Sequence, residues 1–322
     1  MEYRRLGGSG LKLSELSFGS WVTFNKQVDA ALAERLFGTC FDAGINFFDN
    51  AEGYEAGLSE VVMGKALKSL ARPRDSYCVS SKVFFGATGN PGPTQMGLSR
   101  KHVTEACHQA LQRLQVDYLD LYFCHRPDPE TPIGETVWAM HNLVTQGKVL
   151  YWGTSEWSAD EIIQAHEFAA TNTLTPPTME QPQYNLLDRE RFEVEYAPVF
   201  EKYKMGTTTW SPLASGALTG KYLKGIPEGS RASLEGYEWL KKHMVESERG
   251  QERMQRVARF VPIAEELGTT PSKLAIAWCL LNPNVSTVIL GASRVEQLEE
   301  NLAALDVVPL LGDEIQAKLA AI

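Results

Sequence analysis

Four polar residues of types that can relay a proton lie just after short apolar runs of the chain. Asp49 ends the run NFFD and Tyr54 follows five positions later, Lys82 ends CVSSK, and His125 ends YLDLYFCH. Tyrosine has a reference pKa near ~10, and a lysine ammonium beside it would favour the phenolate and lower that pKa. An aspartate would hold the lysine in place and charged. Such a set can deliver a proton to a developing alkoxide, while the histidine orients the carbonyl group that gives rise to it.

Carbonyl reduction by this set also requires a hydride donor on the other face of the carbonyl, which predicts a nicotinamide cofactor. Each residue alone has a simpler explanation. An aspartate after a strand is often a helix cap or turn former, and a single tyrosine, lysine or histidine can pack, be solvated or bond backbone. Their joint occurrence at these spacings is what favours catalysis over the simpler explanations.

Apolar runs of strand length alternate along the chain with segments of helical periodicity, such as NFFD before LSEVVMGKALKSL and YCVSSK before KHVTEACHQALQRL. This alternation predicts βαβ units and a parallel sheet. The runs end near residues 19, 49, 82, 125, 155, 181, 210 and 290. Eight such runs predict a closed (β/α)8 TIM barrel, in one domain over residues 1–322, with functional side chains at the C-terminal rim. The rim would also carry Ser155, Gln181, Trp210 and Gly291.

Two parts of the chain fall outside the regular alternation. The gap of about 80 residues before the last strand predicts a long insertion after strand 7, with an inserted loop and an extra helix. We expect residues 213–232 to fold over a cofactor, with Lys221 and Arg231 near its phosphates, although both cations fit a solvated face equally well. Glycines before the first strand predict a hairpin cap at the bottom of the barrel. Helix N-caps are expected at Ser59, Ser99, Ser158 and Thr270.

The composition excludes several classes of partner. The net charge is −9 and no long basic block occurs, which argues against nucleic acid and anionic membrane surfaces. No apolar run approaches the ~18 residues of a membrane span, and none near the start has the length of a signal peptide. The five cysteines are scattered without a CxxC pair, so we expect no metal site and no disulfide framework. Reduced core cysteines are typical of a cytoplasmic protein.

Longer motifs surround these residues and resemble the aldo-keto reductases over essentially the whole chain. They are FFDNAEGY (47–54), SSKVFFG (80–86), YFCHRPDP (122–129), YWGTSEW (151–157), EQPQYN (180–185), TWSPLASGALTGKY (209–222) and GASRVEQLEEN (291–301). Within that superfamily, the segments GSWVTF, GLSRKH and LAIAWCLLNPNVS look closest to the branch that contains the β-subunits of voltage-gated potassium channels. The resemblance implies an NADP(H)-dependent oxidoreductase.

The resemblance also implies roles for individual residues. Asp49, Tyr54, Lys82 and His125 match the catalytic tetrad of the family. Ser155 and Gln181 match positions that hold the nicotinamide carboxamide, and Trp210 matches the aromatic residue that stacks on the nicotinamide ring. The rest of the implied cofactor set is Ser20, Trp21, Gln27, Ser211, Leu213, Ser215, Lys221, Arg231, Gly291, Ser293, Gln297, Glu300 and Asn301. The aromatic residues Trp21, Tyr54, Phe85 and Trp157, with His125, suggest a pocket for a small carbonyl substrate.

Two positions depart from relatives in that branch. Animal channel β-subunits have Asn at the position of His125, so the histidine here favours turnover. Glu156 stands where those subunits have Arg and many other family members have Asn, which leaves one cofactor or substrate contact open. Two further functions stay open beside an aldehyde or ketone reductase: a redox-sensing regulatory β-subunit of a potassium channel, and a barrel that has lost catalysis. The resemblance further suggests a homo-oligomer, a tetramer by analogy.

Overall fold

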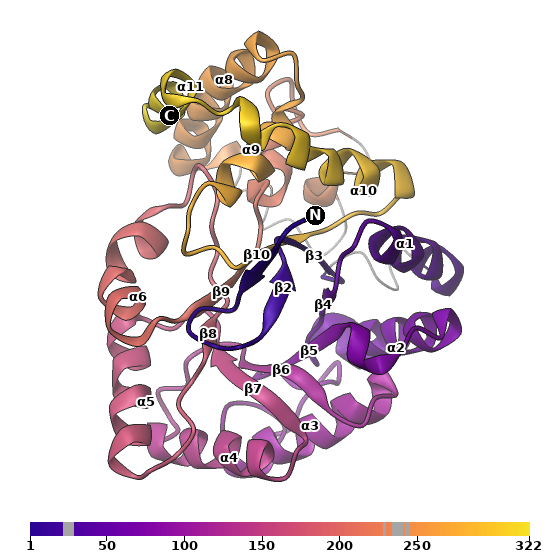
Figure 1. The fold of residues 1–322 in the computed structure, drawn as a ribbon, viewed down its shortest axis with the longest axis vertical. Helices are drawn as coiled ribbons and strands as arrows, with labels where there is room; N and C mark the ends of the chain where they lie inside the picture. The colour runs from indigo at the N-terminus through magenta and orange to yellow at the C-terminus, as the bar shows by residue number, and fades with distance from the viewer. Residues whose placement is uncertain (22–28, 228–229, 234–240, 242–244) are drawn as a thin grey trace.

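Eight parallel strands close into a barrel at the centre of the molecule (Figure 1). The computed structural model describes residues 1–21, 29–227, 230–233, 241 and 245–322. Around the barrel the strands follow the order β10-β3-β4-β5-β6-β7-β8-β9. Their bounds are β3 Leu16–Gly19, β4 Phe47–Asp49, β5 Cys78–Val83, β6 Leu119–Cys124, β7 Val149–Thr154, β8 Met179–Glu180, β9 Gly206–Thr209 and β10 Thr287–Leu290. The (β/α)8 TIM barrel is therefore confirmed, and every strand ends within one residue of its predicted position.

Helices surround the barrel and bury apolar faces in its outer core, while α8 and α11 lie farther out and pack on other helices (Figure 1). They are α1 Ala30–Asp42, α2 Leu58–Leu70, α3 Arg100–Leu114, α4 Ile133–Thr145, α5 Ala159–Thr171, α6 Ala197–Tyr203, α8 Glu248–Glu266, α9 Pro271–Leu280, α10 Val295–Leu302 and α11 Asp313–Ala320. Shorter turns of helix are η1 Tyr54–Gly57, η2 Arg74–Ser76, η3 Arg191–Glu195, η4 Ala214–Thr219, η5 Arg231–Ser233, η7 Ala303–Asp306 and η8 Val308–Leu310.

The predicted helix starts are mostly confirmed. Ser99, Ser158 and Thr270 accept hydrogen bonds from the backbone in the first turns of α3, α5 and α9, and Ser158 forms a capping box with Glu161. The N-cap predicted at Ser59 is wrong. Helix α2 already begins at Leu58, because Gly57 adopts a left-handed conformation with φ of 87° and takes the cap position.

The N-terminal hairpin closes the bottom of the barrel, as predicted. Strands β1 (Tyr3–Arg5) and β2 (Lys12–Ser14) pair antiparallel and lie across the barrel end that faces the viewer in Figure 1. Leu6 and Leu13 of this hairpin join a buried cluster with strand residues such as Phe47, Leu121 and Phe123. The hairpin therefore seals the interior of the barrel, so that the site must lie at the opposite, C-terminal end of the strands.

The long segment between β9 and β10 contains η4, η5, α8 and α9. This agrees with the insertion predicted after strand 7. Side chains such as Phe260 of α8 and Leu274 of α9 belong to the main core, so the segment packs on the barrel.

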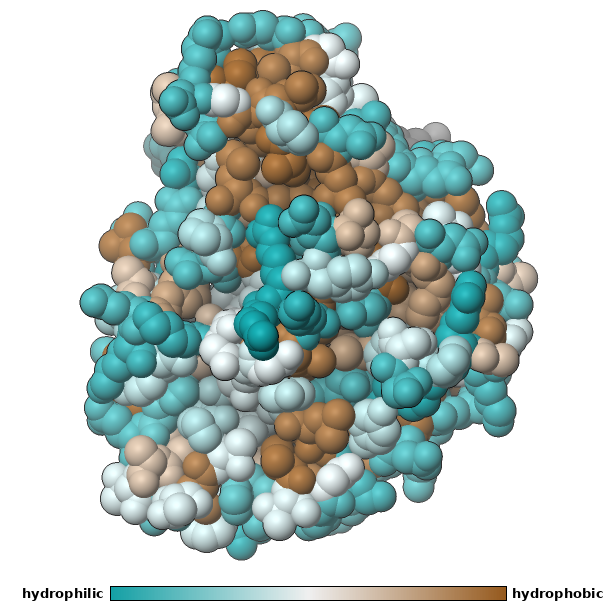
Figure 2. Space-filling view, in the orientation of Figure 1, coloured by the Kyte–Doolittle hydropathy of each residue, from teal (hydrophilic) through white to brown (hydrophobic). Residues whose placement is uncertain are grey.

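Figure 2 shows that apolar residues also reach the surface in this part of the molecule, and Leu310 of η8 is 50% exposed. Among the described residues, no helix has both the length and the apolar character needed to span a bilayer.

Candidate active site

The four tetrad residues meet at the C-terminal rim of three neighbouring strands. Asp49 ends β4, Lys82 lies near the end of β5, His125 directly follows β6, and Tyr54 begins η1 in the loop after β4. The Nζ atom of Lys82 lies 2.7 Å from Asp49 Oδ2, 2.7 Å from the Asn50 carbonyl oxygen and 3.3 Å from the Tyr54 hydroxyl. The side chain of Lys82 is completely buried. A continuous chain of contacts therefore joins the aspartate, the lysine and the phenol.

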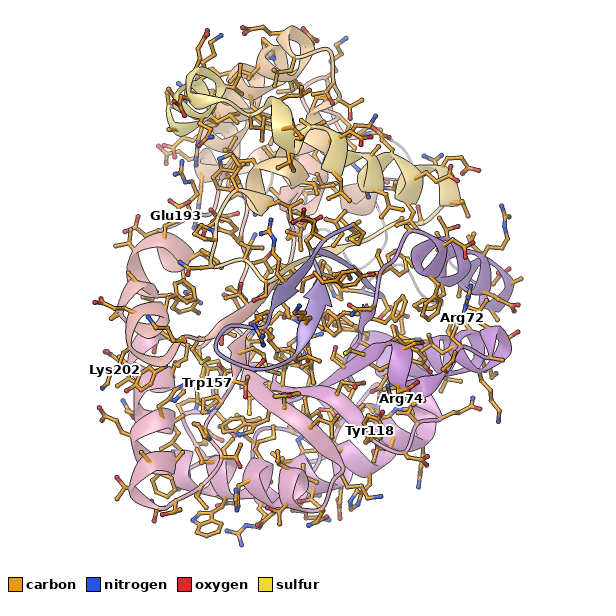
Figure 3. All side chains as sticks on the ribbon, in the orientation of Figure 1. Arg72, Arg74, Tyr118, Trp157, Glu193 and Lys202 are labelled. Carbon is orange, nitrogen blue, oxygen red and sulfur yellow. The ribbon has the colours of Figure 1, made fainter. Side chains whose placement is uncertain are left out.

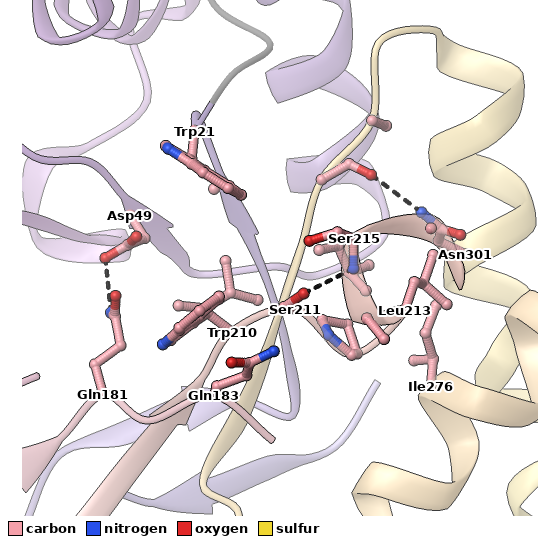
Figure 4. A pocket seen from close by; sticks show the side chains of 18 of the residues that line it. Trp21, Asp49, Gln181, Gln183, Trp210, Ser211, Leu213, Ser215, Ile276 and Asn301 are labelled. Atoms are coloured by element: carbon pink, nitrogen blue, oxygen red, sulfur yellow. Dashed lines mark hydrogen bonds between the residues drawn. The ribbon is translucent and has the colours of Figure 1, made fainter. Parts of the chain in front are cut away.

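The carboxylate of Asp49 accepts hydrogen bonds from three donors, which leave it little freedom. Its Oδ2 faces Lys82, while its Oδ1 accepts hydrogen bonds from Ser80 Oγ at 2.7 Å and Gln181 Nε2 at 3.0 Å. Figure 4 shows the bond between Asp49 and Gln181 at the edge of the pocket. The Ser20 hydroxyl donates to the backbone oxygen of Asp49 at 3.2 Å. Ser20 just after β3, Ser80 in β5 and Gln181 just after β8 therefore hold Asp49, and with it the ion pair to Lys82.

Burial sets the protonation states of the site. It raises the pKa of Tyr54 well above its usual value, the charge of Asp49 adds to that effect, and Arg126 opposes it. The expectation that Lys82 lowers this pKa is therefore not met, because Asp49 already balances the lysine charge and burial dominates. Burial lowers the pKa of Lys82 while Asp49 opposes the change. Burial and the positive charges of Lys82 and Arg126 hold the pKa of His125 well below its usual value, so its imidazole is neutral near pH 7.

A cavity of about 580 Å³ opens over the tetrad and extends away from it. Trp210 and Trp21 form part of its wall, with their ring centres 6.5 Å apart in an edge-to-face arrangement (Figure 4). Beyond Trp210 the cavity follows the loop that carries Ser211, Leu213 and Ser215. Most of the predicted site residues line it: Trp21, Asp49, Tyr54, Phe85, His125, Ser155, Gln181, Trp210, Ser211, Leu213, Ser215, Lys221, Gly291, Ser293, Gln297 and Asn301.

Several predicted residues do not line this cavity. Trp157 is 3% exposed and belongs to the core, on the α5 and α6 side of the barrel in Figure 3. Its carbonyl oxygen accepts a hydrogen bond from the Tyr196 hydroxyl. Ser20 is buried beneath Asp49, and Glu300 is exposed on α10. Gln27 lies outside the described residues, and Arg231 begins η5 but its side chain is not described.

The match to known proteins extends along nearly all of the chain. Residues 15–320 match the aldo/keto reductase family. The chain belongs to the aldo/keto reductase family. It is 48% identical over 323 residues to a probable voltage-gated potassium channel subunit beta of Oryza sativa subsp. japonica, covering 100% of this chain and 96% of that protein. It is 49% identical over 312 residues to a protein of the same description in Arabidopsis thaliana, covering 97% and 93%. The predicted family and its potassium-channel β-subunit branch are thereby confirmed.

In this aldo/keto reductase, Glu156 anchors the aromatic wall of the cavity. Its backbone is left-handed, with φ of 59°. Its Oε1 accepts hydrogen bonds from the Gln183 backbone at 2.6 Å and from Trp210 Nε1 at 3.1 Å, and its Oε2 pairs with Arg191 at 2.7 Å. The carboxylate therefore fixes Trp210 from outside the cavity. The role of Glu156, which the sequence left open, is therefore a contact with Trp210. Local sequence patterns do not indicate this contact, because the two residues are 54 positions apart.

Replacing Glu156 by Ala is expected to lower the free energy of unfolding by about 1–3 kcal/mol. The substitution leaves the Trp210 indole, the Gln183 amide and the Arg191 guanidinium without their shared acceptor. Urea unfolding followed by tryptophan fluorescence measures the change. Glu167→Ala is the matched control, because Glu167 pairs with Lys202 on the surface where both side chains are more than half exposed. Equal midpoints for the two variants would contradict an anchoring role for Glu156.

Two further cavity residues were missed by sequence reasoning. Arg253 of α8 binds both oxygens of Asp188, with nitrogen–oxygen distances of 2.6 and 2.7 Å. Asp188 also accepts a hydrogen bond from Gln183, which links α8 to the rim near Glu156. Arg126 lines the cavity next to His125. Arg126 directly follows His125 in the motif YFCHRPDP, and that position was the available signal for it. Arg253 lies in a helix without a pattern that points to a cavity, so only the folded chain brings it to the site.

Proposed function

We propose that this aldo/keto reductase reduces an aldehyde or ketone to an alcohol, with NADPH as the hydride donor and Tyr54 as the general acid. The observation that carries the proposal is the chain of contacts from Asp49 through Lys82 to Tyr54, at the end of the cavity that Asp49, Tyr54 and His125 line. Members of this family are typically NAD(P)H-dependent oxidoreductases. The presence of His125 as the fourth member of the set also supports turnover rather than binding alone.

The residues along the cavity fit a dinucleotide. The cavity runs from the tetrad past Trp210 to Ser293, Gln297 and Asn301, and these donors suit ribose and phosphate oxygens. The loop after Trp210 turns at Gly216, whose φ of 93° favours glycine. The N-terminus of α10 follows Ser293 and favours an anion. A bound nicotinamide would supply hydride to the carbonyl carbon.

The residues of the tetrad would each perform a separate task. Tyr54 is protonated at neutral pH, so its hydroxyl can give a proton to the carbonyl oxygen as negative charge develops there. The Lys82 ammonium, 3.3 Å from the phenol oxygen, would stabilise the phenolate that results. Asp49 holds that ammonium in place. The neutral imidazole of His125 packs edge-on against the Tyr54 ring, with centres 5.7 Å apart, and would orient the carbonyl by hydrogen bonding.

The oxidation of NADPH by a panel of aldehydes and ketones, followed by absorbance, tests this function. We expect saturable turnover, and a lower dissociation constant for NADPH than for NADH in fluorescence titrations. The expected preference rests on Lys221, which lines the cavity and could pair with a phosphate. A protein that binds NADPH but oxidises it with no member of the panel would contradict the reductase proposal.

A second candidate is a regulatory β-subunit of a potassium channel whose bound cofactor senses redox state. The relatives in Oryza sativa and Arabidopsis thaliana favour it, because both are described as probable voltage-gated potassium channel β-subunits. This role would place the chain in the cytoplasm as a homo-oligomer, with a tetramer as the expected form. Co-purification with a coexpressed plant voltage-gated potassium channel, together with light scattering of the free protein, tests both points. Absence of the complex and a monomeric mass would contradict this candidate.

A further inference from the structure

Arg126 is a cation in the cavity wall that has no anionic partner among the described residues. It directly follows His125 and lines the cavity beside Tyr54 and Phe85. Across the described residues, no carboxylate oxygen lies within 4.0 Å of its guanidinium. Arg253, which lines the same cavity, differs in this respect because Asp188 binds it with both oxygens. Of these two arginines of the cavity wall, Arg126 is therefore the one without a carboxylate partner among the described residues.

The protein contacts of Arg126 orient its guanidinium but use only one nitrogen. Nη1 donates to the backbone oxygen of His125 at 2.5 Å and to Ser155 Oγ at 3.5 Å. The central carbon of the guanidinium lies 5.9 Å from the ring centre of Phe85. Neither Nε nor Nη2 has a hydrogen-bond acceptor among the described residues, and neither is enclosed. One edge of a fixed, planar donor group is therefore available to a ligand in the cavity.

The charges around Arg126 leave its own charge uncompensated. Lys82 and Asp49 neutralise each other at 2.7 Å, and Glu156 pairs with Arg191. His125 is uncharged near pH 7, for the reasons given above. Among these groups, Arg126 is therefore the one whose charge no other member cancels, in a chain whose overall net charge is −9. A single partly buried cation of this kind favours a ligand with one negative charge.

We propose that Arg126 binds a carboxylate of the substrate, so that the preferred substrates are aldehydes or ketones that also carry a carboxylate group. The open Nε–Nη2 edge matches the two oxygens of a carboxylate in a bidentate pair. Because Arg126 adjoins His125, the carboxylate would be held on the same side as the carbonyl oxygen that His125 orients. This inference rests on the proposed reductase function, and it adds the chemical class of the substrate.

Substrate pairs in which a methyl ester replaces the carboxylate, and so removes its charge, test the proposal. The pairs are para-carboxybenzaldehyde with its methyl ester, and succinic semialdehyde with its methyl ester, which place the carboxylate at two distances from the aldehyde. We expect kcat/KM of the wild type to favour the free acid in at least one pair by roughly 10- to 100-fold, as for a hydrogen bond to a charged group. Arg126→Gln should remove most of that preference by raising KM for the acid. Arg126→Lys, which keeps the charge but lacks the planar edge, should retain part of it.

A binding measurement keeps this inference separate from the reductase function. Dissociation constants of benzoate and benzamide are measured by tryptophan fluorescence in the wild type and in Arg126→Gln. We expect benzoate to bind the wild type more tightly and to lose that advantage in the variant. Equal affinity for both compounds, or equal losses of kcat/KM for acid and ester in Arg126→Gln, would overturn the proposal and leave Arg126 as a positioning residue for His125 and Ser155. Selective benzoate binding without turnover of any aldehyde would support the anion site and reject the reductase function.

Discussion

Replacement of Tyr54 by Phe is expected to lower kcat for aldehyde reduction by roughly 10²- to 10⁴-fold, the usual contribution of a general acid. The substitution removes only the hydroxyl that lies 3.3 Å from Lys82 Nζ. It keeps the ring that packs edge-on against His125 and lies 4.9 Å from the lysine nitrogen. The loss should therefore come from the missing proton donor rather than from a rearranged pocket. Steady-state oxidation of NADPH with a reactive aromatic aldehyde measures it.

Cofactor binding provides the control for this variant. Tyr54 lies at the tetrad end of the cavity, away from Ser293, Gln297 and Asn301, so Tyr54→Phe should bind NADPH within about twofold of the wild type. Because burial raises the pKa of Tyr54 well above its usual value, the wild-type rate should show no alkaline loss from this group near neutral pH. Near-wild-type kcat in Tyr54→Phe would assign the proton donor to another residue.

The fold could be predicted from the sequence because polar residues mark the ends of the apolar runs that form the strands. In a parallel barrel, polar side chains that end apolar runs all meet at one rim. Asp49, Lys82 and His125 could therefore be placed together from their positions alone, and the structure brings them together. The strand bounds followed for the same reason, even for β8, which has only two residues. The wrong cap at Ser59 shows the limit of local patterns, because the left-handed Gly57 takes the cap position two residues earlier.

The remainder of the site depends on backbone geometry and distant contacts that composition does not reveal. Trp157 follows Ser155 by two positions and was expected to face the cavity with it. The left-handed turn at Glu156 intervenes, and the indole packs into the core instead. The hydrogen bond between Trp210 and Glu156 joins residues that are 54 positions apart, so only the folded chain shows it. Arg126 stands in the segment HRPDP, which resembles a turn, and the absence of a partner for its charge is visible only in three dimensions.

Replacement of Lys82 by Met is expected to cost about 3–5 kcal/mol of unfolding free energy, the typical loss when one member of a buried ion pair is removed. The carboxylate of Asp49 is then left 3% exposed, without the ammonium that lies 2.7 Å from it. An unpaired carboxylate that stays buried bears the full cost of desolvation, so the folded state of the variant is destabilised. Urea unfolding at neutral pH measures this difference.

The double variant Asp49→Asn/Lys82→Met separates the charge from the packing. Asn keeps an oxygen that can accept from Ser80 and Gln181, the two donors that Oδ1 has in the wild type, and it removes the unpaired charge. We expect the double variant to regain most of the lost stability, because no unpaired buried charge remains. Under the proposed mechanism neither variant should reduce aldehydes, since both lack the Lys82 ammonium beside Tyr54. If Lys82→Met unfolds at the urea concentration of the wild type at neutral pH, the ion pair contributes no net stability and Lys82 acts in catalysis alone.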